Sequence, residues 1–279
     1  MPELPSDVDE TVRRALQEDV GTGDVTTRAV VPADATAEGR FVAKAGGVIC
    51  GLDVASRAFS PSAGRGVGVV WRTNDGARVE VGESFGDVTG QARAILTCER
   101  VALNFLTHLS GIATLTREFV DACAGTESVI LCTRKTLPGL RPLERYAVEV
   151  GGGMLHRAGL FDAVLIKDNH VAIAGGVAEA VRRARAHADL SIEVEVDSID
   201  QLEEALAAGA DRILLDNADM ETVKRAVAIV RDRTPLEVSG GMTLETVREI
   251  APLGRLLISV GRITHSAPAL DISLDVTVT

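Results

Sequence analysis

The chain has 279 residues, of which 46% are hydrophobic and 25% are charged, and its formal net charge is −11. This composition is typical of a globular protein with a substantial core, and the negative charge argues against general binding to nucleic acids or anionic membranes. No apolar run is long enough for a membrane span, residues 1–5 lack the features of a signal peptide, and the cysteines show no CxxC spacing. We therefore expect a reduced, cytoplasmic protein without a zinc site or a disulfide framework.

The first part of the chain predicts helices around a small sheet. Residues 6–19 have the hydrophobic period of a helix, and Ser6 and Asp9 are spaced for an N-terminal capping box. Short, partly alternating runs predict strands at 39–43, 67–72, 77–81 and 84–88. A long helix is predicted from residue 92, and we expect Ser110-Gly111 to interrupt it before it resumes to about residue 124.

After Gly125 the sequence alternates between strand-like and helical patterns. Six apolar runs predict strands at 129–133, 163–167, 192–196, 212–216, 236–239 and 256–260. Parallel strands with right-handed crossovers form either an open doubly wound sheet or a barrel. Polar or glycine residues end every one of these strands, which favours a ring of loops around one pocket. Because a TIM barrel closes with eight strands, six strands predict an α/β fold with an incomplete barrel.

Basic residues follow the first two predicted strands, although lysine is scarce in this chain. Arg134 and Lys135 come after the first strand and Lys167 after the second, and only four lysines occur beside 25 arginines. His156 and Arg157 follow three consecutive glycines, which permit close contact with a ligand. A His-Arg pair is usually a surface feature, but the triple glycine favours a functional one. Together these five residues form a candidate anion-binding cluster.

Carboxylates end two further neighbouring strands. Glu195 and Asp216 could bind sugar hydroxyls, hold Mg²⁺ through water, or stabilise a developing positive charge. The alternative is a structural ion pair with Arg134 or Lys167. Glu193 shares a strand face with Glu195, so strand alternation does not decide which of the two carboxylates faces the site.

Glycines at the ends of the last two strands indicate a phosphate site. Backbone N–H groups can approach a phosphate closely there, and loops after late barrel strands often form such sites. The residues of this candidate site are Ser239, Gly240, Gly241 and Gly261. The alternative is that these glycines only end strands. Arg100 lies on the long helix among apolar neighbours, which favours a boundary residue over one that reaches across a subunit interface.

Several short strings of residues, in order along nearly the whole chain, carry a resemblance to a known family. They include residues 18–27, 99–106 and 109–114, the TRKTLPGLR stretch at 133–141, and residues 151–157, 165–170, 193–198, 214–217, 237–241 and 260–266. Together they resemble the quinolinate phosphoribosyltransferase family. The resemblance implies a sandwich domain at residues 1–110, joined by the C-terminal tail 270–279, and a barrel of fewer than eight strands at residues 111–269.

The resemblance also implies a reaction and a mode of assembly. Quinolinate and phosphoribosyl pyrophosphate would be converted to nicotinate mononucleotide, pyrophosphate and CO₂ with the help of Mg²⁺. The enzyme would be a homodimer, and in some members a larger assembly, in which the sandwich of one subunit covers the barrel mouth of the other. Its partners would be small molecules, with no nucleic acid and no membrane.

The resemblance assigns a role to each candidate residue. The residues that would hold the two carboxylates of quinolinate are Arg134, His156, Arg157 and Lys167, with Arg100 reaching in from the neighbouring subunit. The residues that would cradle the 5′-phosphate are Ser239, Gly240, Gly241 and Gly261. Glu195 and Asp216 would bind the ribose hydroxyls and Mg²⁺, and Lys135 would lie near the pyrophosphate. The predicted catalytic residues are thus Lys135, Lys167, Glu195 and Asp216.

Two positions beside the predicted carboxylate clamp depart from the family pattern. Cys132 stands where the family commonly has aspartate, and Leu155 where it often has asparagine. A second interpretation therefore keeps the fold and the phosphoribosyl chemistry but takes another pyridine or aromatic carboxylate as acceptor, in a specialised pathway. A third interpretation is a non-catalytic binding homologue, against which the intact set of cations and carboxylates argues.

Overall fold

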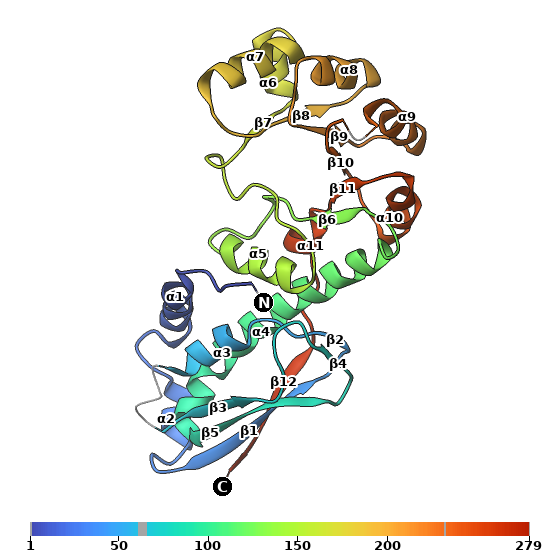
Figure 1. The fold of residues 1–279 in the computed structure, drawn as a ribbon. Coiled ribbons are helices and arrows are strands. Elements are labelled where there is room, and N and C mark those ends of the chain that lie inside the picture. Colours follow the sequence, from blue (N-terminus) through green and yellow to red (C-terminus); the bar gives the residue numbers. More distant parts are fainter. Residues whose placement is uncertain (1, 61–65, 232, 279) are drawn as a thin grey trace. The chain divides into compact units, whose positions relative to one another are not determined.

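The structure is a computed structural model that describes residues 2–60, 66–231 and 233–278 and contains two compact units (Figure 1). Unit 1 comprises Met1–Arg117, Thr136–Gly152 and Thr264–Thr279, and unit 2 comprises Glu118–Lys135 and Gly153–Ile263. An antiparallel sheet lies in unit 1 and a six-stranded parallel sheet in unit 2. These two sheets, with their helices, confirm the predicted α/β class.

Unit 1 is built on a four-stranded sheet in the order β12 (Ile272–Val278), β1 (Thr36–Ala43), β5 (Ser84–Gln91) and β3 (Gly68–Trp71). The end of the chain thus pairs with the first strand. Burial alternates along most of β1, and Phe41 packs on Trp71 with ring centroids 4.7 Å apart. The other elements of this unit are α1 (Val8–Val20), α2 (Val25–Val30), β2 (Gly47–Val48), α3 (Leu52–Phe59), β4 (Arg78–Val79) and α5 (Arg141–Val150).

The start of α1 differs from the predicted one. The expected capping box of Ser6 and Asp9 is wrong, because the helix begins at Val8 with Asp7 as its N-cap, and no side chain caps it. A turn comes first, in which the N–H of Val8 donates to the carbonyl of Pro5 at 3.2 Å. A backbone hydrogen bond, and not a side chain, therefore stabilises the start of the helix.

The long helix α4 (Ala92–Ala122) runs without the interruption that we predicted at Ser110-Gly111. Ser110 instead bonds across to the segment before α3, where its Oγ accepts the N–H of Cys50 at 2.9 Å. A Cβ on Gly111 would lie 2.1 Å from the carbonyl oxygen of Pro268. The small residues therefore serve tertiary packing, which outweighs their weak helix propensity. Within the described ranges, no helix is both long and apolar enough to cross a membrane.

Asp75 joins three parts of unit 1. Its carboxylate accepts the N–H groups of Gly51 and Leu52, at 2.9 and 3.1 Å, at the start of α3. It also accepts the hydroxyl of Tyr146 from α5 at 2.7 Å. The turn that carries Asp75, predicted from Asn74-Asp75-Gly76, thus holds two helices in place, and Gly76 allows it with a φ of 90°.

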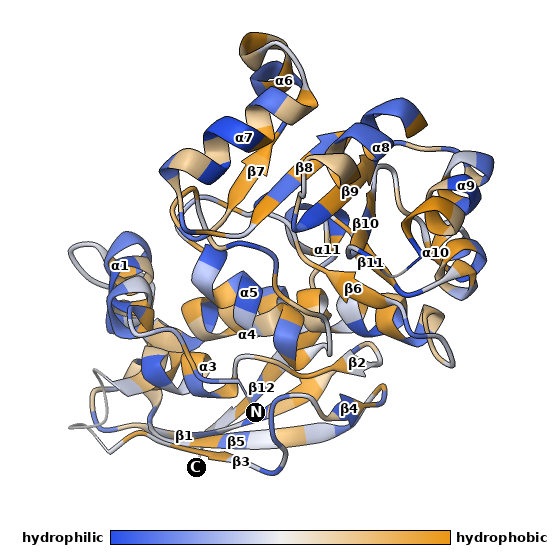
Figure 2. Ribbon diagram, turned by 45° about the horizontal axis from the view of Figure 1, so that its top comes forward, coloured by the Kyte–Doolittle hydropathy of each residue, from blue (hydrophilic) through white to orange (hydrophobic). Residues whose placement is uncertain are grey.

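Unit 2 contains six parallel strands in the order β6–β11–β10–β9–β8–β7. Their bounds are β6 (Val129–Leu131), β7 (Val164–Ile166), β8 (Ile192–Val196), β9 (Arg212–Asp216), β10 (Leu236–Ser239) and β11 (Leu256–Ser259). Each lies within two residues of its predicted range, and the short strands β6 and β7 are hydrophobic throughout (Figure 2). The helices that follow are α6 (Asp168–Ala174), α7 (Val177–His187), α8 (Ile199–Ala207), α9 (Met220–Val230), α10 (Leu244–Ile250), the 3₁₀ turn Ala251–Leu253 and α11 (Arg262–His265).

The parallel sheet has β6 and β7 as its two edge strands. An extended segment lies along the outer side of β6, where Met154 bonds to Ile130 and Cys132 through main-chain contacts of 2.8 and 3.1 Å. This segment continues directly into His156 and Arg157. An irregular stretch of chain therefore extends the sheet at its open edge, as expected for a barrel that lacks two strands.

Candidate active site

A cavity of about 310 Å³ lies in unit 2 at the carboxyl ends of the parallel strands. Eight predicted site residues line it: Arg134, Lys135, His156, Arg157, Lys167, Glu195, Asp216 and Ser239. A larger hollow, of about 570 Å³, lies at the amino ends of β9, β10 and β11. We assign the site to the carboxyl ends, because charged side chains from several strands converge there, as in other α/β barrels.

Strand alternation places the polar side chains of the cavity in two layers. Glu195, Asp216 and Ser239 lie at the ends of β8, β9 and β10, and each lines the cavity. Two residues earlier on the same strand faces lie Glu193, Leu214 and Glu237, all of them buried. The question left open by the sequence is thereby answered in geometric terms: Glu195 faces the cavity, and Glu193 lies below it.

The mouth layer pairs cations with carboxylates. Lys167, the first residue after β7, forms an ion pair with Oε2 of Glu195 through its Nζ. Asp216 accepts a hydrogen bond of 2.7 Å from the side chain of Asn217. The two carboxylates at the mouth thus have different partners, a lysine for Glu195 and an amide for Asp216, and both residues line the cavity.

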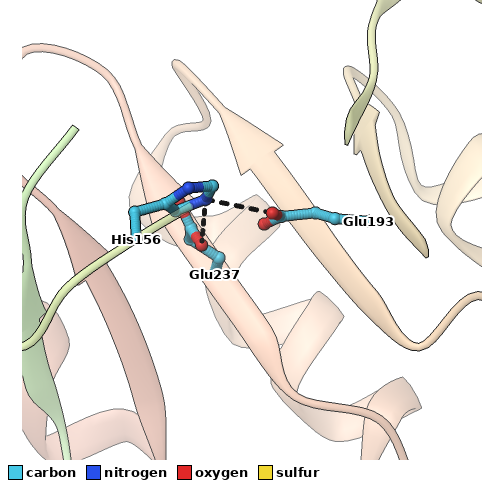
Figure 3. A group of neighbouring side chains, drawn as sticks. All are labelled: His156, Glu193 and Glu237. Carbon is cyan, nitrogen blue, oxygen red and sulfur yellow. Dashed lines mark ion pairs between the residues drawn. The ribbon is translucent and has the colours of Figure 1, made fainter. Parts of the chain in front are cut away.

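Below the mouth, three buried side chains form a cluster (Figure 3). Nε2 of His156 lies 3.0 Å from Oε2 of Glu193 and 3.4 Å from Oε2 of Glu237. Nδ1 of His156 faces the backbone N–H of Arg157 at 2.8 Å. These contacts engage both ring nitrogens. The three side chains also have the spacing of ligands around a metal ion.

Burial and charge shift the pKa values of this cluster in opposite directions. Burial raises the pKa of Glu193, and the charge of Glu237 adds to this effect against the hydrogen bond from His156. Burial acts against the ionised form of Glu237 too, but bonds from His156 and its other neighbours outweigh it and lower that pKa. Burial alone would lower the pKa of His156, and the two carboxylates outweigh it and raise that pKa. The N–H of Arg157 opposes this increase, because a ring nitrogen that accepts a hydrogen bond carries no proton.

Two guanidinium groups lie close together beside the cluster. Burial lowers the pKa of Arg157, and the charge of Arg134 lowers it further. Nη1 of Arg157 donates to the carbonyl of Ala163 at 3.3 Å. Like charges held near one another in a cavity are stabilised by an anion between them, so this part of the cavity is suited to a carboxylate or a phosphate.

The loop after β10 has a left-handed backbone, and at Gly240 only glycine fits. Gly240 and Gly241 have φ values of 101° and 57°. A Cβ on Gly240 would lie 2.2 Å from Oδ1 of Asn217 and 2.7 Å from its backbone nitrogen. Asn217 has itself a positive φ of 51°, and its N–H donates to the carbonyl of Ser239 at 2.9 Å. The two loops are therefore packed against each other at the carboxyl ends of β9 and β10.

Four predicted site residues are not among those that line the cavity. Gly240 and Gly241 directly follow the lining residue Ser239, and Gly261 comes two residues after β11. Arg100 lies on α4, in unit 1, where it is exposed.

The cavity also contains residues that we did not predict as part of the site: Thr133, Leu165, Leu214, Glu237 and Ser259. Side chains two residues apart on a strand lie on the same face, so Asp216 and Ser239 could have indicated Leu214 and Glu237. Cys132, one of the two departures from the family pattern, is fully buried, and its Sγ accepts the N–H of His156 at 3.4 Å.

Comparison with known proteins identifies the family of this chain. The sequence model of the quinolinate phosphoribosyl transferase N-terminal domain matches residues 24–110, and that of the C-terminal domain matches residues 112–275. The chain belongs to the quinolinate phosphoribosyltransferase family. The prediction from the sequence strings is thus confirmed.

Relatives of this phosphoribosyltransferase chain cover nearly its whole length. Nicotinate-nucleotide pyrophosphorylase (carboxylating) of Mycobacterium leprae (strain TN) is 48% identical over 272 residues, which are 95% of this chain and 96% of the relative. A probable enzyme of the same name from Bacillus subtilis (strain 168) is 43% identical and covers 93% of this chain and 90% of its own. The crystal structure of NadC from Streptococcus pyogenes superimposes with a TM-score of 0.95, at 40% identity, over 100% of this chain and 99% of that one.

Proposed function

We propose that this chain transfers a phosphoribosyl group from phosphoribosyl pyrophosphate to quinolinate and decarboxylates the product to nicotinate mononucleotide. One observation carries the proposal: basic side chains from three separate segments converge on one cavity, opposite carboxylates from two further strands. Family membership supports the same reaction class, since the relatives are named for this reaction in one direction or the other.

The basic side chains would grip the acidic acceptor. Arg134, Arg157 and Lys167 are placed to hold the two carboxylates of quinolinate, with His156 beneath them. A planar guanidinium can hold a carboxylate through two hydrogen bonds, so two of them fix the orientation of the ring. Lys135 also lines the cavity, where its charge would neutralise the departing pyrophosphate.

The carboxylates at the mouth would stabilise the sugar. When pyrophosphate leaves, positive charge develops on the ribose, and Glu195 and Asp216 can stabilise it at close range. The ring nitrogen of quinolinate then attacks the anomeric carbon with its own lone pair, so no general base is required. Alkylation makes the ring cationic, which allows it to accept the electron pair released when CO₂ leaves C2, and a proton then replaces CO₂ at that carbon.

Mg²⁺ is part of the proposal. Glu195 and Asp216 offer hard carboxylate oxygens at the mouth of the cavity, the type of ligand that Mg²⁺ prefers, often through its own waters. The bound ion would neutralise negative charge on the pyrophosphate group. Ser239 and the positive-φ glycines Gly240 and Gly241 would hold the 5′-phosphate through backbone N–H groups, and Gly261 would complete that cradle.

The proposed enzyme is a cytoplasmic homodimer in which Arg100 of one subunit completes the site of the other. Arg100 is exposed on α4, and apolar side chains such as Phe161 and Ile173 are 79% and 84% exposed in unit 2. Exposed apolar side chains of this kind support a further contact surface. Four buried thiols are compatible with a reducing compartment.

Release of CO₂ from a panel of pyridine carboxylates tests the proposed substrate. With phosphoribosyl pyrophosphate and Mg²⁺ present, quinolinate should give CO₂ and pyrophosphate in equal amounts. Pyridine acids that lack a carboxylate beside the ring nitrogen should give no CO₂. Turnover of another aromatic acid in preference to quinolinate would favour the specialised-pathway interpretation, and tight binding without release of pyrophosphate would favour a non-catalytic homologue.

A further inference from the structure

The buried cluster beneath the cavity poses a charge problem. An anion-binding cavity has two carboxylates, Glu193 and Glu237, directly below its basic wall, where their charges would weaken the grip on an acidic ligand. Carboxylates buried in this way are costly unless they have partners. Their position therefore needs an explanation other than contact with the substrate.

Glu237 is held firmly from the strands on either side. Oγ of Ser259 on β11 donates to its Oε1 at 2.6 Å, and Nη1 of Arg212 on β9 donates to its Oε2 at 3.3 Å. Glu237 is only 1% exposed. The carboxylate therefore has one orientation, in which Oε2 faces Nε2 of His156 at 3.4 Å. The guanidinium of Arg212 also balances its charge.

His156 in turn is fixed on its other side. Nδ1 faces the N–H of Arg157 at 2.8 Å, and the N–H of His156 itself donates to Sγ of Cys132 at 3.4 Å. Because Nε2 faces Glu193 and Glu237, the substrate would have to displace these carboxylates to reach that nitrogen. The ring is thus held between the buried carboxylates and the main chain of the next residue, Arg157, whose side chain lines the cavity.

We propose that Glu237 is a positioning residue: it holds the Nε2–H of His156 and, through the imidazole ring, keeps the main chain of Arg157 in place at the cavity wall. Glu193, whose Oε2 is nearer to the same nitrogen at 3.0 Å, is the other acceptor of the ring. Glu237 lines the floor of the cavity but is only 1% exposed, so it acts on the substrate through this ring, and His156 acts mainly through Arg157. This inference rests on the proposed function, in which Arg157 grips a carboxylate of the acceptor.

The substitution Glu237→Gln tests the proposal, because it removes the charge and keeps the shape. We expect the KM for quinolinate to rise about tenfold or more, as for a buried hydrogen-bond partner lost, and the KM for phosphoribosyl pyrophosphate to change less than about twofold. Glu203→Gln, at an exposed position of α8, is the matched control and should change neither value. A purely structural defect would lower the fraction of active enzyme and leave both KM values alone.

Nitrogen NMR of the imidazole gives a readout that does not depend on activity. The chain has five histidines, and His156 is assigned by the signal that is lost in His156→Asn. In the ligand-free enzyme, Nε2 of His156 should carry a hydrogen that exchanges slowly with water, and Glu237→Gln should speed this exchange and shift the ring signals. If the wild-type enzyme failed to turn over quinolinate, this measurement would still test the positioning role.

Three outcomes would overturn the proposal. The first is an unchanged KM for quinolinate in folded Glu237→Gln, and the second is an unchanged spectrum of His156. The third is a stoichiometric metal ion in the purified wild-type protein that Glu237→Gln loses, because the three side chains would then be its ligands. If Glu237→Gln fails to fold, Ser259→Ala replaces it: this variant keeps both charges, removes the 2.6 Å bond, and should raise the same KM by a smaller factor.

Discussion

Single residues in this site take their roles from their depth along the strand on which they lie. Glu193 and Glu195 are two residues apart on β8 and have the same chemistry, yet one is buried against His156 and the other pairs with Lys167 at the mouth. Their depth in the barrel separates them, because a rise of roughly 7 Å over two residues takes a side chain from the core to the ligand.

Lys167, one of only four lysines in the chain, allows a direct test of the proposed active site. Replacing it with alanine should lower kcat/KM by roughly 10²–10³-fold, since a preorganised charge is lost and the partner carboxylate of Glu195 is left without it. Steady-state kinetics with both substrates measure the loss. Lys224→Ala, at an exposed position of α9, is the matched control and should keep full activity. Normal turnover by Lys167→Ala would contradict the assignment of the cavity.

Gly240 permits a test of the proposed phosphate cradle. Gly240→Ala combines a positive φ with a close contact to Asn217, so the free energy of unfolding should fall by about 1–3 kcal/mol, and the KM for phosphoribosyl pyrophosphate should rise. Gly209 is the matched control, because it has a φ of 76° but nothing within 4 Å of an added Cβ. Gly209→Ala should leave that KM unchanged. Equal effects of the two variants on KM would count against the cradle.

Much of the site could be predicted residue by residue, but the buried cluster could not. Eight of the predicted residues line one cavity, because each lies at the end of, or shortly after, an apolar run or a glycine run that the sequence displays. The cluster requires knowledge that the segment at 153–157 lies along β6, which brings His156 over β8 and β10. No local pattern encodes a contact of that range.

Elements were predicted well where one local signal decides them. The six parallel strands follow from apolar runs bounded by polar residues, and their bounds agree within two residues. The interruption of α4 was predicted wrongly, since the propensity of Ser110-Gly111 is local and the contact with Pro268 is not. The N-terminus of α1 differs for a similar reason: side-chain spacing suggested a cap that the main-chain turn at Pro5 replaces.

The junction between α5 and the Asp75 turn has a pH dependence that one tyrosine reports. Burial raises the pKa of Tyr146, and the hydrogen bond to Asp75 raises it further. Above about pH 10, the ordinary tyrosine pKa, the folded state therefore holds a proton that the unfolded state has lost. Stability from this group is fully present below that pH and is lost as the pH rises above it.

Alkaline titration measures this effect directly, because Tyr146 is the only tyrosine of the chain. Tyrosinate absorbance should appear only together with unfolding, well above the pH at which free tyrosine ionises. Tyr146→Phe should be less stable at neutral pH, since it loses the bond to Asp75, but its stability should fall less steeply under alkaline conditions. Ionisation of Tyr146 near pH 10 in the folded protein would contradict the buried hydrogen bond.

At the scale of the whole molecule, the predicted site residues are distributed over both units. Unit 2 contains the entire cavity, whereas the exposed Arg100 belongs to unit 1. The proposed sharing of sites can be tested by mixing subunits. Arg100→Ala and Lys167→Ala should each be nearly inactive, and random exchange of subunits should restore about a quarter of the wild-type activity, because half of the dimers then have one intact site of two.

A second mixture is the control for this experiment. Lys167→Ala and Arg134→Ala both affect the cavity of their own subunit, so every site in their mixed dimer retains one defect and no activity should return. Exchange is verified by mass spectrometry of isotope-labelled subunits. Activity regained in both mixtures, or in neither after verified exchange, would show that Arg100 does not cross to another subunit.

The open edge of the parallel sheet has a consequence for the way a bound molecule affects the fold. Arg134 follows β6 and Lys167 follows β7, the two outermost strands. A dicarboxylate bound by both residues would form a reversible non-covalent link between the two edge strands of the sheet. Binding of this ligand should therefore slow amide hydrogen exchange in β6, in β7 and in the segment that carries Met154. The two edges of the barrel would be linked only while the ligand is bound.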